Sequence, residues 1–189
     1  MANLEELAWS VRNDGYSEVN AEAKVCQDIV LKAISTSSLS RNVTIKGGVV
    51  MRSITGSSRR ATQDEYCFDV CLDDVGASLL INSKEQIFTE KLRSLLRFGP
   101  LSTRYKDIFD LCYLSDYVDK DRLVKCLNTY IFDDPGMREN DMIAVMKRVN
   151  RTFSDKLYRQ NIGRSTRLNW LGIKVDDAFK KITGFLETL

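Results

Sequence analysis

Histidine is absent from the 189 residues of this chain, and its absence removes several kinds of active site. Ser-His-Asp and Cys-His nucleophilic sites, HExxH zinc sites and histidine-mediated proton transfer all need an imidazole. Acid–base chemistry would therefore depend on Asp, Glu, Lys, Tyr or Cys side chains. Proline is also scarce, with 2 residues, so no proline-rich linker divides the chain.

Long hydrophobic runs and an excess of either charge are missing as well. No apolar run approaches the roughly 20 residues of a membrane span, so we expect no membrane contact. The first residues, MANLEELAWSVRNDG, are acidic and amphipathic, which is not the pattern of a signal peptide. Lys and Arg total 28 against 26 Asp and Glu, and a net charge of +2 predicts no nucleic-acid affinity by itself, so no DNA contact is inferred.

The five cysteines contain no CxxC pair and have no histidine beside them to complete a zinc site. We expect reduced, mostly buried thiols and a cytoplasmic location. The composition, with 43% hydrophobic and 29% charged residues, is typical of a globular protein of one domain or one domain with a helical extension.

The periodicity of apolar residues changes along the chain. Helical spacing follows the possible caps Asn3 and Asn20, and residues 43–45, 65–72 and 79–81 read as short strands, the last two forming a hairpin. From residue 83 onward, helices are predicted after the capping box at Ser83, after Ser102 or Thr103, after Asp119, over residues 142–153 and after Asp176. The sequence therefore predicts an α+β protein with a small α/β region over residues 1–82 and an all-helical region over residues 83–189.

Lys46-Gly47-Gly48 follows a predicted strand and precedes a predicted helix over residues 49–55. Two glycines at such a turn allow backbone N–H groups to approach a phosphate closely, and a helix N-terminus adds positive potential. The spacing alone fits a tight structural turn equally well, because it matches neither a Walker A loop nor a GxGxxG fingerprint.

Two further groups of charged residues lie on predicted helices. Arg104, Asp107 and Asp110 are spaced three apart and share one helix face, while Lys106 and Asp110 form an i,i+4 pair. This pattern indicates either a solvated ladder of ion pairs or a polar face directed at a phosphate or metal. Lys91 lies at the edge of a buried stripe, where a lysine suits binding of an NTP triphosphate.

Taken in order, these blocks resemble one family. IKGGVVMRSITGSSRRATQD resembles the opening motif of the AbiEii/AbiGii-type toxins, which are nucleotidyltransferase-fold proteins of bacterial toxin–antitoxin and abortive-infection systems. INSKEQIFTEKLRSLL resembles the second block of that family, and RYKDIFDLCYL is similar to the third. The matching segments cover residues 40–64 and 79–115.

The resemblance implies transfer of an NMP from an NTP, with Mg²⁺ as cofactor, to an RNA end such as that of a tRNA or to a protein hydroxyl. An antitoxin protein is the implied partner. The implied catalytic residues are Asp64, Lys91 and Asp107, with Asp64 as the metal ligand. The implied nucleotide-binding residues are Lys46, Gly47, Gly48, Arg104, Lys106 and Asp110.

The sequence departs from the family pattern directly after Asp64. The family carries a second Asp two residues later, whereas Tyr66 stands at that position here. Glu65 and Asp69 are at odd spacings from Asp64, so neither shares its face on an unbroken strand. We therefore expect a family segment to be missing between Asp64 and Glu65, and a site with one carboxylate to hold Mg²⁺ poorly.

Two other classes of function remain open on the sequence alone. One is a non-catalytic interaction protein of the same fold that binds an antitoxin or another protein. The other is an RNA-binding helical region that uses Arg148, Arg151, Arg159, Arg164 and Arg167, although arginines at these spacings also fit a solvated surface.

Overall fold

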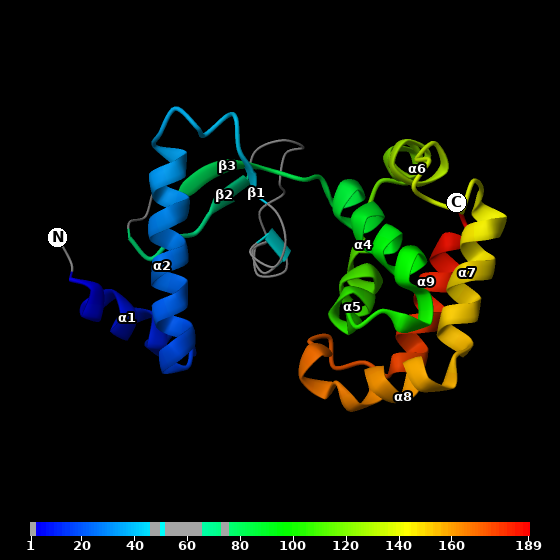
Figure 1. The fold of residues 1–189 in the computed structure, drawn as a ribbon. Coiled ribbons are helices and arrows are strands. Elements are labelled where there is room, and N and C mark those ends of the chain that lie inside the picture. The colour runs from blue at the N-terminus through cyan, green and yellow to red at the C-terminus, as the bar shows by residue number, and fades with distance from the viewer. Residues whose placement is uncertain (1–2, 46–49, 52–65, 73–75) are drawn as a thin grey trace. The chain divides into compact units, whose positions relative to one another are not determined.

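The computed structural model describes residues 3–45, 50–51, 66–72 and 76–189 (Figure 1). It divides the chain into two compact units, Met1–Asn82 and Ser83–Leu189. The described elements are helices together with a three-stranded sheet, which is an α+β architecture. Of the helix expected over residues 49–55, residues 50 and 51 are described, and both are helical.

Helix α1 (Leu4–Asn13) begins at the predicted cap. The side chain of Asn3 accepts hydrogen bonds from the backbone N–H groups of Glu5 and Glu6, at 2.6 and 3.3 Å. The carboxylate of Glu6 accepts in return from the backbone N–H of Asn3 at 3.0 Å, which completes a capping box. The apolar face of α1 packs on α2 through Ala8 and Val11.

Helix α2 (Glu18–Ser35) begins earlier than predicted. Ser17, not Asn20, occupies the N-cap position, and Asn20 lies inside the helix. The earlier start places Glu18 in the first turn, where a carboxylate interacts favourably with the helix dipole. Glu18 also accepts from Arg12 of α1 at 2.6 Å. Ala21 and Val25 of α2 complete the small core between the two helices.

The sheet has the strand order β1-β3-β2, with β1 at Thr44–Ile45, β2 at Tyr66–Phe68 and β3 at Ala77–Ile81. Strand β1 is parallel to β3, and β2 is antiparallel to it, so the predicted hairpin is confirmed. The predicted strand over residues 65–72 is too long, because β2 ends at Phe68. Beyond it, the N–H of Cys71 donates to the carboxylate of Asp28 in α2 at 2.9 Å instead of to a neighbouring strand.

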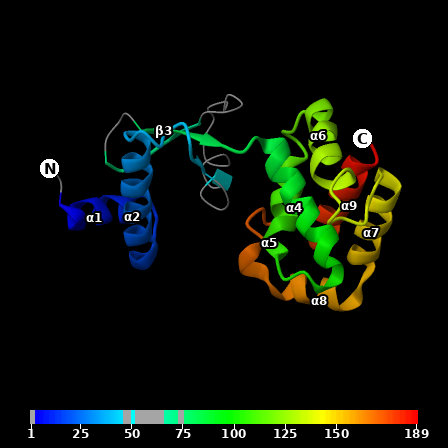
Figure 2. The ribbon, with the colours of Figure 1, turned by 45° about the horizontal axis from the view of Figure 1, so that its top comes forward.

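The second unit consists of helices α4 (Lys84–Phe98), α5 (Tyr105–Leu114), α6 (Lys120–Leu127), α7 (Met142–Ser154), α8 (Lys156–Arg164) and α9 (Val175–Leu186), with short helical turns at Gly99–Leu101, Asn128–Phe132 and Thr166–Leu168. Helix α4 contacts α5, α6 and α7 (Figures 1 and 2). The rings of Phe88 in α4 and Phe185 in α9 meet edge to face, with centroids 5.5 Å apart. The predicted capping box at Ser83 forms with Gln86, and the predicted stop at Gly99 ends α4.

Two predicted caps in this unit are wrong. Arg104, not Ser102 or Thr103, is the N-cap of α5, and the Ser102 hydroxyl accepts from the Arg104 N–H at 3.3 Å in the turn before the helix. Helix α9 begins at Val175, so Asp176 lies in its first turn, where its carboxylate pairs with Arg159 of α8 instead of capping.

Helix α8 was not predicted at all. Asp155 caps it by accepting from the N–H of Tyr158 at 2.8 Å, and Tyr158 and Ile162 are its buried positions.

Cys26, Cys71, Cys112 and Cys126 are free thiols. Their burial differs from the expectation, because Cys112 is buried and Cys71 and Cys126 are intermediate, while Cys26 is exposed on α2. Burial, followed by a hydrogen bond with Asp28, raises the pKa of the Cys71 thiol to about 11, so this thiol stays protonated at neutral pH.

Candidate functional site

Lys91 in α4 and two aspartates of α5 form a compact ionic cluster. The Nζ atom of Lys91 donates to Asp107 Oδ1 and to Asp110 Oδ2, each at 2.7 Å. Lys91 and Asp107 are largely buried, and only 2% of the Asp110 side chain is exposed. The three-residue spacing of the aspartates places both on the α5 face that meets α4. The structure therefore brings Lys91 together with two aspartates that the sequence placed on one face of a second helix.

Trp170, in the segment between α8 and α9, completes the cluster. It follows the turn at Thr166–Leu168, and its Nε1–H donates to Asp110 Oδ1 at 2.8 Å. The indole ring also contacts the ring of Tyr113 in α5, with centroids 5.4 Å apart. Asp110 thus has one oxygen bonded to Lys91 and the other to Trp170, which fixes its orientation.

Opposing effects act on the pKa of Lys91. Burial lowers the pKa because it disfavours the charged ammonium, while the negative charges of Asp110 and Asp107 and their hydrogen bonds raise it. The attraction prevails, so the pKa lies above its ordinary value of 10.5 and Lys91 is protonated at neutral pH. An ammonium group has three N–H donors, and the two aspartates take two of them.

Arg104 and Lys106 lie at the edge of this cluster. The guanidinium of Arg104 is 4.0 Å from Asp107 Oδ2, and 70% of its side chain is exposed. Lys106 is exposed on α5. The predicted i,i+4 pair between Lys106 and Asp110 is not among the ion pairs of the described residues, because Lys91 and Trp170 already hold both Asp110 oxygens.

Tyr158 of α8 packs beside the cluster without joining its hydrogen bonds. Its ring contacts that of Tyr105 in α5 at 5.6 Å, and its side chain is fully buried. The hydroxyl has no hydrogen-bond partner within the described part of the chain. Burial, and then the charges of Tyr105 and Asp107, raise the pKa of this hydroxyl, so it remains neutral up to strongly alkaline pH.

The remaining predicted site residues, Lys46, Gly47, Gly48 and Asp64, lie outside the described residues, and so does the junction between Asp64 and Glu65. Their predicted roles, and the predicted missing segment, stay predictions.

A magnesium site does not fit the described carboxylates. Across residues 3–45, 50–51, 66–72 and 76–189, no group of three His, Cys, Asp or Glu side chains is arranged to hold a metal ion. Asp107 and Asp110 face the ammonium of Lys91, which occupies the position a cation would need. Their observed role is to hold a lysine.

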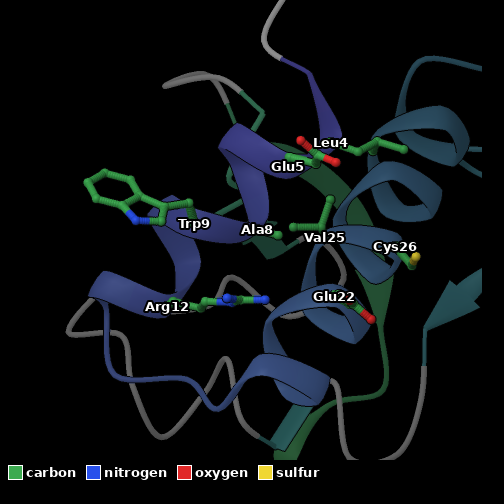
Figure 3. Close-up of a pocket in the computed structure, with 8 residues that line it drawn as sticks. All are labelled: Leu4, Glu5, Ala8, Trp9, Arg12, Glu22, Val25 and Cys26. Atoms are coloured by element: carbon green, nitrogen blue, oxygen red, sulfur yellow. The ribbon is translucent and has the colours of Figure 1, made fainter.

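The first unit contains a separate hollow of about 580 Å³ between α1 and α2 (Figure 3). Its lining is mainly apolar, with Leu4, Ala8, Trp9 and Val25 beside the charged Arg12, and the figure shows the Trp9 indole directed outward from α1.

None of the helices in the described ranges is both long enough and apolar enough to cross a membrane.

Comparison with known proteins identifies the family. The family model for the nucleotidyl transferase AbiEii toxin of type IV toxin–antitoxin systems matches residues 67–180, more than half of the chain. The chain therefore belongs to the AbiEii nucleotidyl transferase toxin family, as the sequence motifs predicted. No curated protein and no solved structure matches the chain.

The matched region includes the Lys91 block and the Arg104–Asp110 block and begins after the Gly47-Gly48 block. It also includes Trp170, which the sequence analysis did not single out. A tryptophan usually needs a hydrogen-bond partner for its N–H when it is buried, but at a sequence separation of 60 no periodicity connects Trp170 with Asp110.

Proposed function

We propose that the protein is a nucleotidyltransferase toxin that transfers an NMP from an NTP to an acceptor hydroxyl, on an RNA end or on a protein, with release of pyrophosphate. The observation that carries this proposal is the Lys91–Asp107–Asp110 cluster, which lies in the family-matched region. An ammonium fixed by two carboxylates is a pre-oriented positive charge, and such charges stabilise the negative charge that develops during phosphoryl transfer.

In this proposal the residues of the cluster have different tasks. Lys91 directs its third N–H to a phosphate oxygen of the NTP, and the exposed guanidinium of Arg104 contacts a second phosphate oxygen. Asp107 and Asp110 keep Lys91 protonated and oriented, and Trp170 holds Asp110. Lys46, Gly47, Gly48 and Lys106 are proposed as further nucleotide contacts on the basis of the family resemblance.

A divalent metal is the general cofactor of nucleotidyltransferases, and the described residues provide no site for it. The predicted requirement for Mg²⁺ therefore depends on Asp64 and the resemblance. It is tested by adding EDTA to the transfer assay and restoring Mg²⁺, and EDTA-resistant transfer would contradict it.

Arg104→Ala gives the most direct test of the proposed site, because this exposed side chain makes a single long ion pair within the described residues, at 4.0 Å, and its removal should not disturb folding. The assay measures transfer of label from an α-³²P-labelled NTP to total RNA and to protein. We expect at least a tenfold loss with Arg104→Ala and an unchanged rate with Arg122→Ala, a matched exposed arginine on α6. Equal rates for both variants would contradict a role for Arg104 in binding phosphate.

A second candidate function is a non-catalytic protein of this family that binds an antitoxin. The observation that favours it is the absence of a carboxylate two residues after Asp64. Stable complex formation with an antitoxin, combined with no label transfer at any metal concentration, would support this function over catalysis.

A further inference from the structure

The helical unit contains another hollow, which is polar and shares no residue with the Lys91 cluster. Its volume is about 410 Å³. It is lined by the end of α4, by the loop before α7 and by one residue of α7: Leu96, Arg97, Phe98, Gly136, Met137, Arg138, Glu139 and Arg148. Hollows of this size are typical of small-molecule sites.

Positive charge without ion-pair partners gathers in this hollow. Some arginines of the described chain pair with carboxylates, as Arg12 does with Glu18, Arg93 with Asp134 and Arg159 with Asp176. Within the same described ranges, Arg97, Arg138 and Arg148 take part in no ion pair with a carboxylate. The lining carries three arginines and one carboxylate, that of Glu139, so the hollow has an excess of positive charge and favours an anion.

Arg148 is fixed before any ligand arrives. Its Nε donates to the backbone carbonyl of Leu96 at 3.0 Å, which caps the C-terminal end of α4. A Cβ atom on Gly99 would lie only 2.5 Å from Arg148 Nη2, so the guanidinium occupies space that a glycine leaves open. The cap uses the Nε–H and leaves the two terminal NH₂ groups for other acceptors.

The loop that supplies Arg138 is also anchored. Asp134 accepts from Arg93 of α4 and from the backbone N–H of Gly136, the latter at 2.7 Å. A site whose walls are already ordered loses less conformational entropy when it binds a ligand.

The other lining residues restrict the chemistry of the ligand. Phe98 is 51% exposed and offers a ring on which a nucleobase can stack. Glu139 is buried, and its carboxylate accepts hydrogen bonds from hydroxyl or amino groups. An inorganic anion alone would use neither residue, whereas a sugar phosphate that carries an aromatic base would use both.

We propose that this hollow binds a nucleoside monophosphate, with the phosphate on the arginines, the base against Phe98 and a sugar hydroxyl or base amino group on Glu139. The proposal does not depend on the transferase activity or on the Lys91 cluster.

The test is calorimetric titration of the full chain with AMP, with adenosine and with inorganic phosphate. We expect AMP to bind at least tenfold more tightly than either fragment, because only AMP has both the charge and the base. Arg138→Ala and Phe98→Ala alter exposed side chains, and each should weaken AMP binding about tenfold or more. Arg122→Ala is the control and should leave AMP binding unchanged, whereas Arg104→Ala distinguishes binding in this hollow from binding at the Lys91 cluster.

The proposal would be overturned by no heat with AMP at millimolar concentration, by equal affinity for AMP and inorganic phosphate, or by AMP binding that Arg104→Ala removes and Arg138→Ala does not. The last result would assign the nucleotide to the Lys91 cluster. Binding of a short single-stranded RNA without binding of AMP would also reject the proposal, in favour of a polynucleotide surface.

Discussion

Replacing Asp110 tests the Lys91 cluster most directly. In Asp110→Ala, the indole N–H of Trp170 loses its acceptor, which costs about 1 kcal/mol at this partly exposed position. Lys91 loses one of its two carboxylates, which costs about 1–2 kcal/mol more because Asp107 remains. The total of about 2–3 kcal/mol corresponds to a melting temperature lower by roughly 10–20 °C for a domain of this size.

Asp107→Ala is the matched comparison. Asp107 lies closer to the surface, and its removal leaves the bond between Lys91 and Asp110 intact, so we expect a loss of about 1 kcal/mol. The double variant should lose more than the sum of the single losses, because Lys91 would then be buried without any carboxylate partner. Far-UV circular dichroism during heating and during urea titration measures all three free energies of unfolding.

The reasoning would be refuted by equal losses for Asp107→Ala and Asp110→Ala, or by strictly additive losses in the double variant. Either result would mean that the two carboxylates do not share one buried ammonium. A small stability loss in Asp107→Ala together with a loss of transfer activity by orders of magnitude would assign Asp107 to the chemistry in addition to the packing.

Three further changes test neighbouring features. Tyr158→Phe removes a buried hydroxyl that has no hydrogen-bond partner among the described residues, so it should raise the free energy of unfolding by about 1 kcal/mol in urea titrations. A lower free energy of unfolding would show that the hydroxyl does have an acceptor. The raised pKa of Lys91 stabilises the folded state fully below its ordinary pKa of 10.5, and this stabilisation is lost as the pH rises through the higher folded-state pKa. The free energy of unfolding of Lys91→Met should therefore fall less steeply than that of the unaltered protein above about pH 10.5. Parallel curves of stability against pH would contradict this. Gly99→Ala places a methyl group against Arg148 at a φ of 53° and should cost about 1–3 kcal/mol by thermal melting, whereas an unchanged melting temperature would show that Arg148 moves away freely.

Local signals predicted the capped helices well. Asn3, Ser83 and Asp119 each accept the hydrogen bonds expected of an N-cap, because these bonds join residues two or three apart. The caps predicted at Asn20 and Asp176 were wrong because tertiary contacts decided the helix starts, as the pairing of Asp176 with Arg159 shows. Helix α8 had a readable signal that was overlooked, since Asp155 precedes the buried i,i+4 pair Tyr158 and Ile162.

The candidate site was predictable in part. One family block pointed to Lys91 and another to Asp107 and Asp110, and the structure joins the two blocks through the packing of α4 on α5. Sequence reasoning could not find that Lys91 holds both aspartates, because side chains 16 and 19 residues apart share no periodicity. Trp170 was missed for the same reason.

The two tryptophans of the chain lie one in each unit, Trp9 in α1 and Trp170 beside Asp110. Trp9 is 66% exposed and Trp170 is 38% exposed, so the indole of the second unit has the more apolar surroundings and should fluoresce at shorter wavelength. A Trp9→Phe variant would therefore report the unfolding of the helical unit alone, and Trp170→Phe that of the first unit alone. The protein thus carries an intrinsic optical probe in each half, with which the cooperativity between the halves can be measured without any attached label.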